Sequence, residues 1–378
     1  MKYMGSKQTM LLNGLGDTIV AEAEGRKRIV DLFAGSGAVS WFAAERTDLP
    51  VLALDLQHYA VILASAVLKR TRPASARELV TRWLDPARRS RSRTSAWRSW
   101  LDLGVAPIQG LRKRDVQESR RLCRSIDGGL VWRAYGGYYF SPGQAVTLDE
   151  MLRHLPECEG ERSLCLAALI ATASRCAAAP GHTAQPFRPS PSALPYIAAA
   201  WKKDPLEEAV ELLGGLARRH ANVVGDAYVG DAVVEAKTLK AGDLVILDPP
   251  YSAVQYSRFY HVLETLARGD VTSVEGAGRY PPFTERPRSD FSVKTLAEPA
   301  LSGLLAALAD VGCNAVLTFP AAAASNGLSG DRVRSLAEAH FDVVSTKVAM
   351  RFSTLGGNNA LRPSRHDTHE LIVTMRPQ

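Results

Sequence analysis

Short apolar runs that end in polar residues set the order of the elements along this chain. The clearest is residues 244–247, four consecutive apolar positions that stop at Asp248, Pro249, Pro250 and Tyr251. An apolar run of this length, with β-branched members and turn residues on both sides, predicts a buried parallel strand. The prolines end the strand because neither can donate to a strand ladder. We therefore expect Asp248 and Tyr251 at the carboxyl end of a strand, where open α/β sheets bind ligands.

Similar runs predict a sheet whose strands alternate with helices. Strands are expected at residues 28–33, 51–54, 227–229, 244–247, 314–319, 341–348 and 370–374. Helices are expected at residues 10–19, 39–46, 57–69 and on the segment that ends at Leu266. The segment 269–295 is rich in Pro and Gly and is expected to be a mobile loop. Strands in alternation with helices indicate an α/β fold with a Rossmann-like, doubly wound sheet.

The middle of the chain breaks this alternation. Residues 71–220 contain helical stretches at 164–178 and 204–221 but no repeat of strand and helix. We therefore predict an inserted, mainly helical domain at 71–220. The catalytic domain is expected to form from residues 1–70 and 221–378, on both sides of the insert.

The first part of this insert is basic. The chain carries a net charge of +7, and the segment from Lys69 to Arg133 holds 17 Lys and Arg against 6 Asp and Glu. Such a segment is typical of a module that binds a polyanion, although a solvated face explains the arginine run 88–93 equally well. The aromatic stretch 132–140 suits contacts to phosphates and unstacked bases, and core packing explains its aromatics about as well.

Composition narrows the class of protein. Hydrophobic residues make up 46% of the chain and charged residues 22%, as in soluble globular proteins. No apolar run approaches the roughly 18 residues of a membrane span, and the start lacks a signal pattern. The five cysteines show no C-x-x-C pair and are odd in number. We expect reduced thiols in a cytoplasmic protein without structural zinc or another metal site.

A glycine-rich turn follows the first predicted strand. The sequence from Asp31 to Gly37 reads D-L-F-A-G-S-G and leads into a helix, which is the arrangement of a nucleotide-type cofactor site. Ser40 stands where a dinucleotide fingerprint has its third glycine, so a smaller adenosine-containing cofactor is expected. Asp55 ends the next strand and is expected to accept hydrogen bonds from ribose hydroxyls; capping the following helix is the alternative. Asp231, at another strand end, is a candidate partner for a cofactor adenine.

The residues after the organising strand predict the chemistry. The carboxylate of Asp248 and the rigid carbonyl of Pro249 form two adjacent acceptors for the hydrogens of an exocyclic amino group. Holding both hydrogens draws the nitrogen lone pair out of conjugation with its ring. Tyr251 offers a flat face on which a base can stack.

With these residues in place, the chain resembles the AdoMet-dependent, Dam-type adenine methyltransferases of DNA. The resemblance covers about residues 1–70 and 223–375, with the insert at the family's target-recognition position. It rests on K-Y-M-G-S-K, on D-L-F-A-G-S-G and on D-P-P-Y. The resemblance implies that the catalytic residues are Asp248, Pro249, Pro250 and Tyr251. It implies that the AdoMet site contains Tyr3, Lys7, Asp31, Phe33, Gly35, Ser36, Gly37, Asp55, Leu56, Asp231 and Ala232. Tyr256 and Arg258 are the candidate substrate residues.

The function implied is methyl transfer from AdoMet to the 6-amino group of adenine in double-stranded DNA, by base flipping and direct displacement, without a metal. A role in restriction-modification or phage defence, with partner proteins, is expected. Three alternatives stay open: methylation of the cytosine 4-amino group, methylation of RNA, and a nucleic-acid-binding module that keeps AdoMet as a structural ligand. Ser is more frequent than Asp at the first motif position in the cytosine enzymes, so D-P-P-Y favours adenine. The recognition sequence, the oligomeric state and the role of the loop 181–187 are not readable from the sequence.

Overall fold

The computed structural model describes residues 7–104, 110–353 and 365–378, and these residues form two units. The helical unit consists of Pro73–Arg218 and Arg258–Arg286. The sheet unit takes the described residues within Met4–Arg72, Arg219–Ser257 and Pro287–Gln378. Each unit has its own packed interior and is described by itself.

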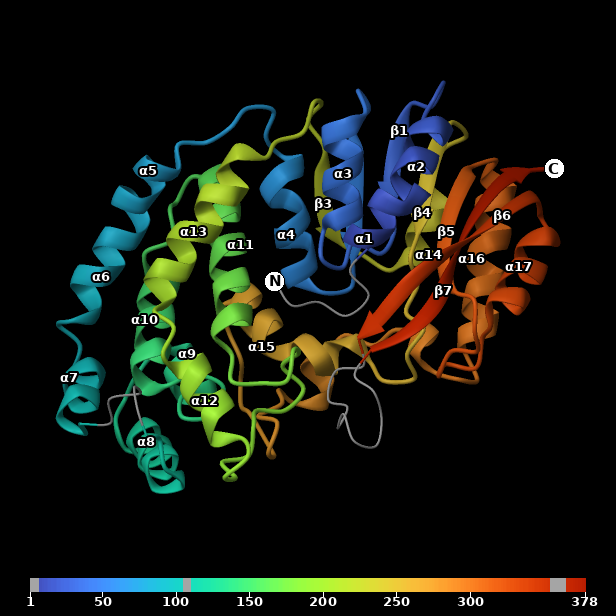
Figure 1. Ribbon diagram of the computed structural model, residues 1–378. Helices are drawn as coiled ribbons and strands as arrows, with labels where there is room; N and C mark the ends of the chain where they lie inside the picture. Colours follow the sequence, from blue (N-terminus) through green and yellow to red (C-terminus); the bar gives the residue numbers. More distant parts are fainter. Residues whose placement is uncertain (1–6, 105–109, 354–364) are drawn as a thin grey trace. The chain divides into compact units, whose positions relative to one another are not determined.

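A seven-stranded sheet forms the centre of the sheet unit (Figure 1). Its strands are β1 (Arg28–Asp31), β2 (Val51–Asp55), β3 (Asp226–Val229), β4 (Asp243–Leu247), β5 (Asn314–Pro320), β6 (Phe341–Ser353) and β7 (Arg365–Pro377). The strand order is β3-β2-β1-β4-β5-β7-β6, in which β7 runs antiparallel to both of its neighbours. The chain order reverses between β1 and β4, so the ligand-binding point of a doubly wound sheet lies beside these two strands. The predicted fold class is confirmed.

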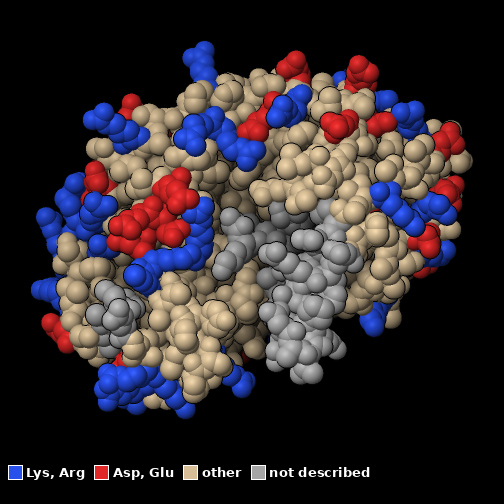
Figure 2. Space-filling view, in the orientation of Figure 1, with Lys and Arg blue, Asp and Glu red and all other residues tan. Residues whose placement is uncertain are grey.

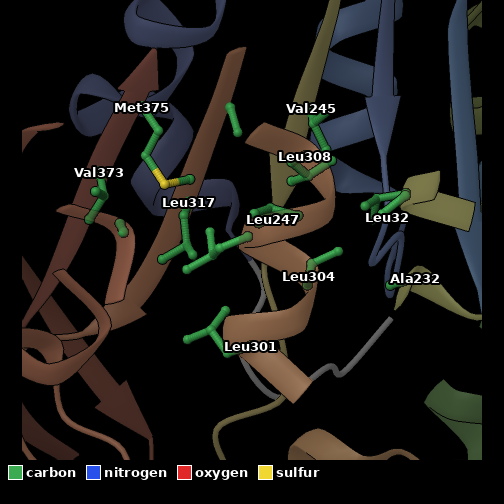
Figure 3. Packing of buried hydrophobic residues seen from close by; sticks show 14 of the residues in the cluster. Leu32, Ala232, Val245, Leu247, Leu301, Leu304, Leu308, Leu317, Val373 and Met375 are labelled. Atoms are coloured by element: carbon green, nitrogen blue, oxygen red, sulfur yellow. The ribbon is translucent and has the colours of Figure 1, made fainter. Parts of the chain in front are cut away.

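Both faces of the sheet are covered, and β4 shows why. Its five residues are all buried, with Leu244 and Ile246 in one hydrophobic cluster and Val245 and Leu247 in another. Because successive side chains of a strand point to opposite faces, each face needs its own helices. The first cluster is covered by α2 (Gly16–Glu22), α3 (Ala38–Arg46) and α4 (His58–Leu68). The second is covered by α16 (Ala297–Val311), whose leucines are seen in Figure 3.

The predicted strands and helices of the sheet unit are present, with shifted ends. The first strand was expected to run to residue 33, but β1 ends at Asp31. The carboxylate of Asp31 accepts the backbone N–H of Phe33 at 3.2 Å, which turns the chain away from the sheet. The last two strands are longer than expected and pair with each other over thirteen residues.

The helical unit contains no strand among its described residues from 73 to 218. Its helices are α5 (Ala76–Leu79), α6 (Asp85–Arg91), α7 (Ser95–Asp102), α8 (Lys113–Ser125), α9 (Leu130–Tyr135), α10 (Pro142–Arg153), α11 (Glu159–Cys176), α12 (Leu194–Trp201) and α13 (Pro205–Arg218). None of the helices in the described parts of the chain has the length and hydropathy to cross a membrane.

The helical unit also takes in residues 258–286, which the sequence analysis assigned to the catalytic domain. Most of α15 (Tyr256–Arg268) therefore belongs to it. The hydroxyls of Tyr135 and Thr265 lie 2.8 Å apart, which ties α15 to α9. The hydroxyl of Tyr139 lies 2.8 Å from the carbonyl oxygen of Gly278. Both contacts join residues far apart in the sequence, which explains why apolar periodicity did not reveal them.

Aromatic residues of the stretch 132–140 fill the interior of the helical unit. The side chains of Trp132, Tyr135, Tyr139 and Phe140 are all fully buried, as is Trp83 of the neighbouring segment. Core packing is therefore the correct alternative for these residues.

The segment 269–295 has more local order than the loop that the sequence predicts. Glu275 and Tyr280 exchange backbone hydrogen bonds of 2.8 and 2.9 Å and close a short hairpin. Two 3₁₀ turns follow, at Phe283–Glu285 and Asp290–Ser292. Proline and glycine here shape specific turns.

Candidate active site

Polar side chains gather along the carboxyl edge of the sheet. Asp31 ends β1, Asp55 ends β2, and Asp248 follows β4 directly. Thr318 lies near the end of β5. Glu370 of β7 pairs with the last residue of β5, because β7 runs in the opposite direction. The carboxyl ends of parallel strands share one edge, so strand order alone brings these five residues together.

The carboxylate of Asp31 holds the glycine turn. One oxygen accepts the N–H of Phe33 and the other accepts the hydroxyl of Ser40, at 2.5 Å. Burial raises the pKa of Asp31 to about 7, against the effect of these two hydrogen bonds. The nearby carboxylates of Asp248 and Asp55 raise this pKa further. Asp31 is 2% exposed, and its two oxygens tie the turn to the first residues of α3.

The turn after β1 depends on two glycines. Gly35 and Gly37 have φ angles of 50° and 77°, in the left-handed region that favours glycine. A Cβ on Gly37 would also lie 3.0 Å from the indole nitrogen of Trp41. That indole donates to the carbonyl of Leu63 at 2.9 Å, so the ring has no room to retreat. Position 37 therefore requires glycine, both for its backbone conformation and for the space beside Trp41.

Asp55 connects this turn to the next strand. Its Oδ2 accepts the N–H of Gly35 and its Oδ1 accepts the N–H of Gln57, each at 2.9 Å. It does not cap α4, whose N-cap residue is Gln57. Asp55 therefore joins the end of β2 to the glycine turn and to the start of α4.

Asp231 has a structural contact that the sequence did not single out. Its Oδ1 accepts the N–H groups of Val233 and Val234, at 2.8 and 3.3 Å, and caps α14 (Ala232–Glu235). The side chain of Ala232 is buried in the hydrophobic core under α16. The exposed face of Asp231 is the part of this pair that a ligand can reach.

Lys7 forms a buried ion cluster with two carboxylates. Its Nζ lies 2.9 Å from Oδ1 of Asp248 and 3.4 Å from Oε2 of Glu370, and the lysine side chain is 3% exposed. Burial lowers the pKa of Lys7, but the two carboxylates and Tyr256 outweigh burial and raise it above its ordinary value. Burial also raises the pKa of Glu370, and Lys7 opposes that effect. The sequence predicted Lys7 as a site residue but gave it no contact with Asp248.

The two oxygens of Asp248 have different surroundings. Oδ1 contacts the ammonium of Lys7 and accepts the hydroxyl of Thr318 at 2.9 Å. In the described chain, no donor contacts Oδ2 at hydrogen-bonding distance. The side chain is 23% exposed, so it remains accessible. One oxygen thus fixes the orientation of the carboxylate while the other is available to a ligand.

A buried asparagine holds the backbone of the Asp-Pro-Pro-Tyr motif. The side-chain amide of Asn326, which is fully buried, donates to the carbonyl of Pro250 at 3.1 Å. The backbone N–H of Asn326 donates to the carbonyl of Tyr251 at 3.4 Å. Within the described residues, the carbonyl of Pro249 has no such donor. Pro249 therefore keeps an acceptor in a backbone that Asn326 makes rigid.

The ring of Tyr251 contacts residues of two other segments. It packs edge to face on Phe319, with ring centroids 6.3 Å apart and an angle of 82°. The ammonium of Lys7 lies 5.7 Å from the centroid of the Tyr251 ring. Tyr251 is half-buried, so part of its ring remains accessible.

Among the predicted site residues of the sheet unit, hydrogen bonds or ion pairs join Asp31 with Phe33, Asp55 with Gly35, and Lys7 with Asp248. Tyr3 lies outside the described residues, and Arg258 belongs to the helical unit. Sequence reasoning missed Thr318, Asn326 and Glu370. Thr318 and Glu370 lie on strands that were predicted, so strand order would have indicated them; Asn326 lies in a connecting segment and had no signal. No three His, Cys, Asp or Glu side chains in the described ranges are placed to hold a metal ion.

A doubly wound sheet with a glycine turn after β1 and Asp-Pro-Pro-Tyr after β4 defines the class of Rossmann-like methyltransferases. Comparison with protein families gives the same result. The model of the D12 class N6 adenine-specific DNA methyltransferases matches residues 3–92 and 201–301, about half of the chain. The chain belongs to this family.

One curated relative is the Modification methylase LlaI of Lactococcus lactis subsp. lactis. It is 26% identical to this chain over 286 residues, which make up 71% of this chain and 39% of the relative. The chain therefore spans about two fifths of the length of that relative. The family model leaves out residues 93–200, which lie in the helical unit.

Proposed function

We propose that the sheet unit transfers the methyl group of AdoMet to the 6-amino group of adenine in DNA. One observation carries this proposal: Oδ2 of Asp248 and the carbonyl of Pro249 are both available, while their neighbours Oδ1 and the Pro250 carbonyl are occupied. Two fixed acceptors at adjacent positions match the two hydrogens of an amino group. Preorganised acceptors of this kind favour the charge that develops on the nitrogen.

The glycine turn fits AdoMet. In this proposal Phe33, Gly35, Ser36 and Gly37 contact the cofactor, and the carboxylate of Asp55 accepts hydrogen bonds from the ribose hydroxyls. AdoMet supplies a methyl group already activated by a sulfonium centre. Lys7 keeps donor capacity, because its Nζ makes ion pairs but no aligned hydrogen bond. The carboxylate of the methionine moiety of AdoMet suits the N–H donors of this ammonium group.

The motif residues position the target base. Asp248 and Pro249 hold the amino hydrogens and direct the nitrogen lone pair, and Tyr251 stacks on the base. A base inside the duplex cannot make these contacts, so the target base leaves the stack. Unstacking and unpairing cost a few kcal/mol, which stacking and the hydrogen bonds offset.

Lys7 and Thr318 act through Asp248. Both contact Oδ1, so they fix the carboxylate rotamer and leave Oδ2 toward the substrate. Lys7 also places a positive charge beside a site that holds two carboxylates. Orientation of this kind contributes to rate by reducing the entropy lost on reaching the reactive geometry.

The biological setting follows from the relative. Its printed name is that of a modification methylase, and we propose the same role for this chain, as the methylating member of a restriction-modification or phage-defence system. Cytoplasmic DNA and the proteins of such a system are the proposed partners. The cytosine 4-amino group and RNA remain the alternative substrates for the same pair of acceptors.

Methyl transfer to defined nucleic acids tests the proposal. The chain is incubated with isotopically labelled AdoMet and with unmethylated genomic DNA or structured RNA, which are then digested to nucleosides and analysed by mass spectrometry. We expect labelled N6-methyladenine from DNA. Labelled 4-methylcytosine, label in RNA alone, or AdoMet binding without any transfer would each overturn the assignment.

A further inference from the structure

A tyrosine in the helical unit lies between two arginines. The guanidinium carbons of Arg120 and Arg279 lie 4.2 and 4.9 Å from the centroid of the Tyr138 ring. Arg120 belongs to α8, Tyr138 follows α9, and Arg279 lies on the hairpin that Glu275 and Tyr280 close. Two neighbouring segments and the distant hairpin thus meet at Tyr138. Its side chain is half-buried, whereas the other aromatic residues of the stretch 132–140 are buried.

Backbone carbonyls fix both guanidinium groups. Nε of Arg120 donates to the carbonyl of Gly137 at 2.9 Å. Nε of Arg279 donates to the carbonyl of Ala134 at 2.8 Å, and its Nη2 donates to that of Arg133 at 3.1 Å. A guanidinium has five N–H donors, so these contacts set the orientation of each group and leave further donors for a ligand.

The hairpin holds Arg279 in a costly backbone conformation. Arg279 has a φ of 55°, the one positive value at a residue other than glycine in the described chain. Two buried side chains hold the hairpin: the carbonyl of Gly278 lies 2.8 Å from the hydroxyl of Tyr139 and 2.9 Å from Nε2 of His261. Such conformations cost of order 1–3 kcal/mol, and they occur frequently at ligand-binding positions.

No carboxylate neutralises this group of arginines. In the described residues, no ion pair joins Arg120, Arg124 or Arg279 to an Asp or Glu. Burial lowers the pKa of Arg120, and the like charges of Arg124 and Arg279 lower it further. At the start of α8, by contrast, an arginine has an acidic partner: Arg112 forms an ion pair with Asp115 at 3.2 Å. The excess positive charge is therefore local to the stack.

The surface around α8 is also basic. Figure 2 shows Lys and Arg side chains gathered at the lower left, over the end of the helical unit that carries α8. Arg124 is exposed and lies four residues after Arg120, so both are on the same face of α8. A basic surface with fixed guanidinium groups suits phosphate oxygens, which accept paired hydrogen bonds.

We propose that Arg120 and Arg279, which pack on Tyr138, together with Arg124 of the same helix face, bind the phosphate backbone of double-stranded DNA. We call Arg120, Arg124 and Arg279 the arginine cluster. That the polyanion bound by this cluster is DNA rests on the proposed function. The cluster contributes affinity and orientation without reading sequence, because phosphate contacts are the same for every base pair. Tyr138 and the hairpin fix Arg120 and Arg279, and Arg124 follows Arg120 one helical turn later on α8.

The salt dependence of DNA binding tests the proposal. Binding of the full chain to a duplex of arbitrary sequence is measured by fluorescence anisotropy over a range of salt concentrations, without AdoMet. Each phosphate contact contributes about 0.9 to the slope of log K against log salt. We expect Arg124→Ala and Arg279→Gly each to reduce this slope by about 0.9. Glycine at position 279 accepts the positive φ, so this variant folds without the strain that alanine would keep.

Arg121→Ala is the matched control. Arg121 is exposed on the same helix and carries the same charge. It is not among the positive charges that lower the pKa of Arg120, which are those of Arg124 and Arg279. We expect it to leave the slope unchanged. Equal slopes for the wild type and the cluster variants, an equal loss in Arg121→Ala, or a cluster effect seen with duplex RNA and not with DNA would overturn the proposal. A wild-type chain that transfers no methyl group but shows the cluster effect would instead overturn the proposed function alone.

Discussion

The ends of β1 and β4 lie side by side in the sheet and each carries an aspartate, but the two carboxylates have opposite roles. Asp31 is buried, and its oxygens accept donors from its own turn and from Ser40 of the helix that follows the turn. Asp248 is partly exposed, and its contacts with Lys7 and Thr318 converge on one oxygen. The first carboxylate completes a loop, whereas the second is oriented by distant residues and keeps an oxygen for a substrate.

This difference shows how one sheet edge serves both cofactor and substrate. A carboxylate whose acceptors are used within its own turn makes a rigid cradle, and the glycines of that turn allow a ligand close to the backbone. A carboxylate such as Asp248, whose contacts involve one oxygen, keeps its other oxygen as an acceptor for a substrate. Neighbouring strands of the same sheet supply both kinds of carboxylate. We expect substitutions to disturb Asp248 more readily than Asp31, because the partners of Asp248 come from distant segments.

Removing Lys7 should have the largest effect on stability. In Lys7→Met, the buried carboxylate of Glu370 and the partly exposed carboxylate of Asp248 remain near each other without their cation. Breaking a buried ion pair from one side costs about 3–5 kcal/mol, so we expect a loss of this order in the free energy of unfolding, measured by urea denaturation.

The double variant Lys7→Met/Glu370→Gln provides the control. It removes one negative charge from the cluster and should recover part of the lost stability. If the single variant unfolds at the same urea concentration as the wild type, the ion cluster has no part in holding the end of β4.

Tyr251→Ala should have the next largest effect, on catalysis. Stacking of a base on an aromatic side chain is worth about 1–3 kcal/mol. We therefore expect kcat/KM for DNA to fall about 10- to 100-fold, with AdoMet affinity retained. Tyr251→Phe keeps the flat face and should keep most of the activity; a loss as large as that of alanine would show that the hydroxyl, and not the ring, is what matters.

Replacing Asp31 should have a smaller effect, on the pH dependence of the free energy of unfolding. Its pKa is raised from 3.8 to about 7, so the folded protein binds this proton more tightly than the unfolded chain does. The stability that results is fully present below about pH 4 and is lost as the pH rises toward 7. We expect Asp31→Asn to reduce this fall in unfolding free energy; an unchanged pH profile would contradict a raised pKa at Asp31.

Much of the sheet unit was predictable because its signals are local. Buried runs such as 244–247, the glycines after β1 and the prolines after β4 each occupy a few consecutive residues. Contacts that join distant segments were not predictable from such signals. Lys7 meets Asp248, and Glu370 comes beside β5 only because β7 runs antiparallel, which no local pattern states.

The helical unit was predicted less well for the same reason. Its helices follow apolar periodicity, but the grouping of residues 258–286 with them depends on contacts such as that of Tyr139 with Gly278. The aromatic stretch 132–140 looks uniform in sequence. Burial divides it into core residues and the half-buried Tyr138, and sequence alone cannot make that division.

The most direct test measures AdoMet affinity and the single-turnover rate of methyl transfer to DNA in two variants, Asp31→Ala and Asp248→Ala. We expect Asp31→Ala to weaken AdoMet binding through its loosened turn. We expect Asp248→Ala to bind AdoMet like the wild type and to lose at least about 10²–10³-fold in rate, the usual effect of removing a preorganised group. An Asp248→Ala protein that keeps most of its methyl-transfer rate would contradict the role of this carboxylate as the acceptor of the target amino group.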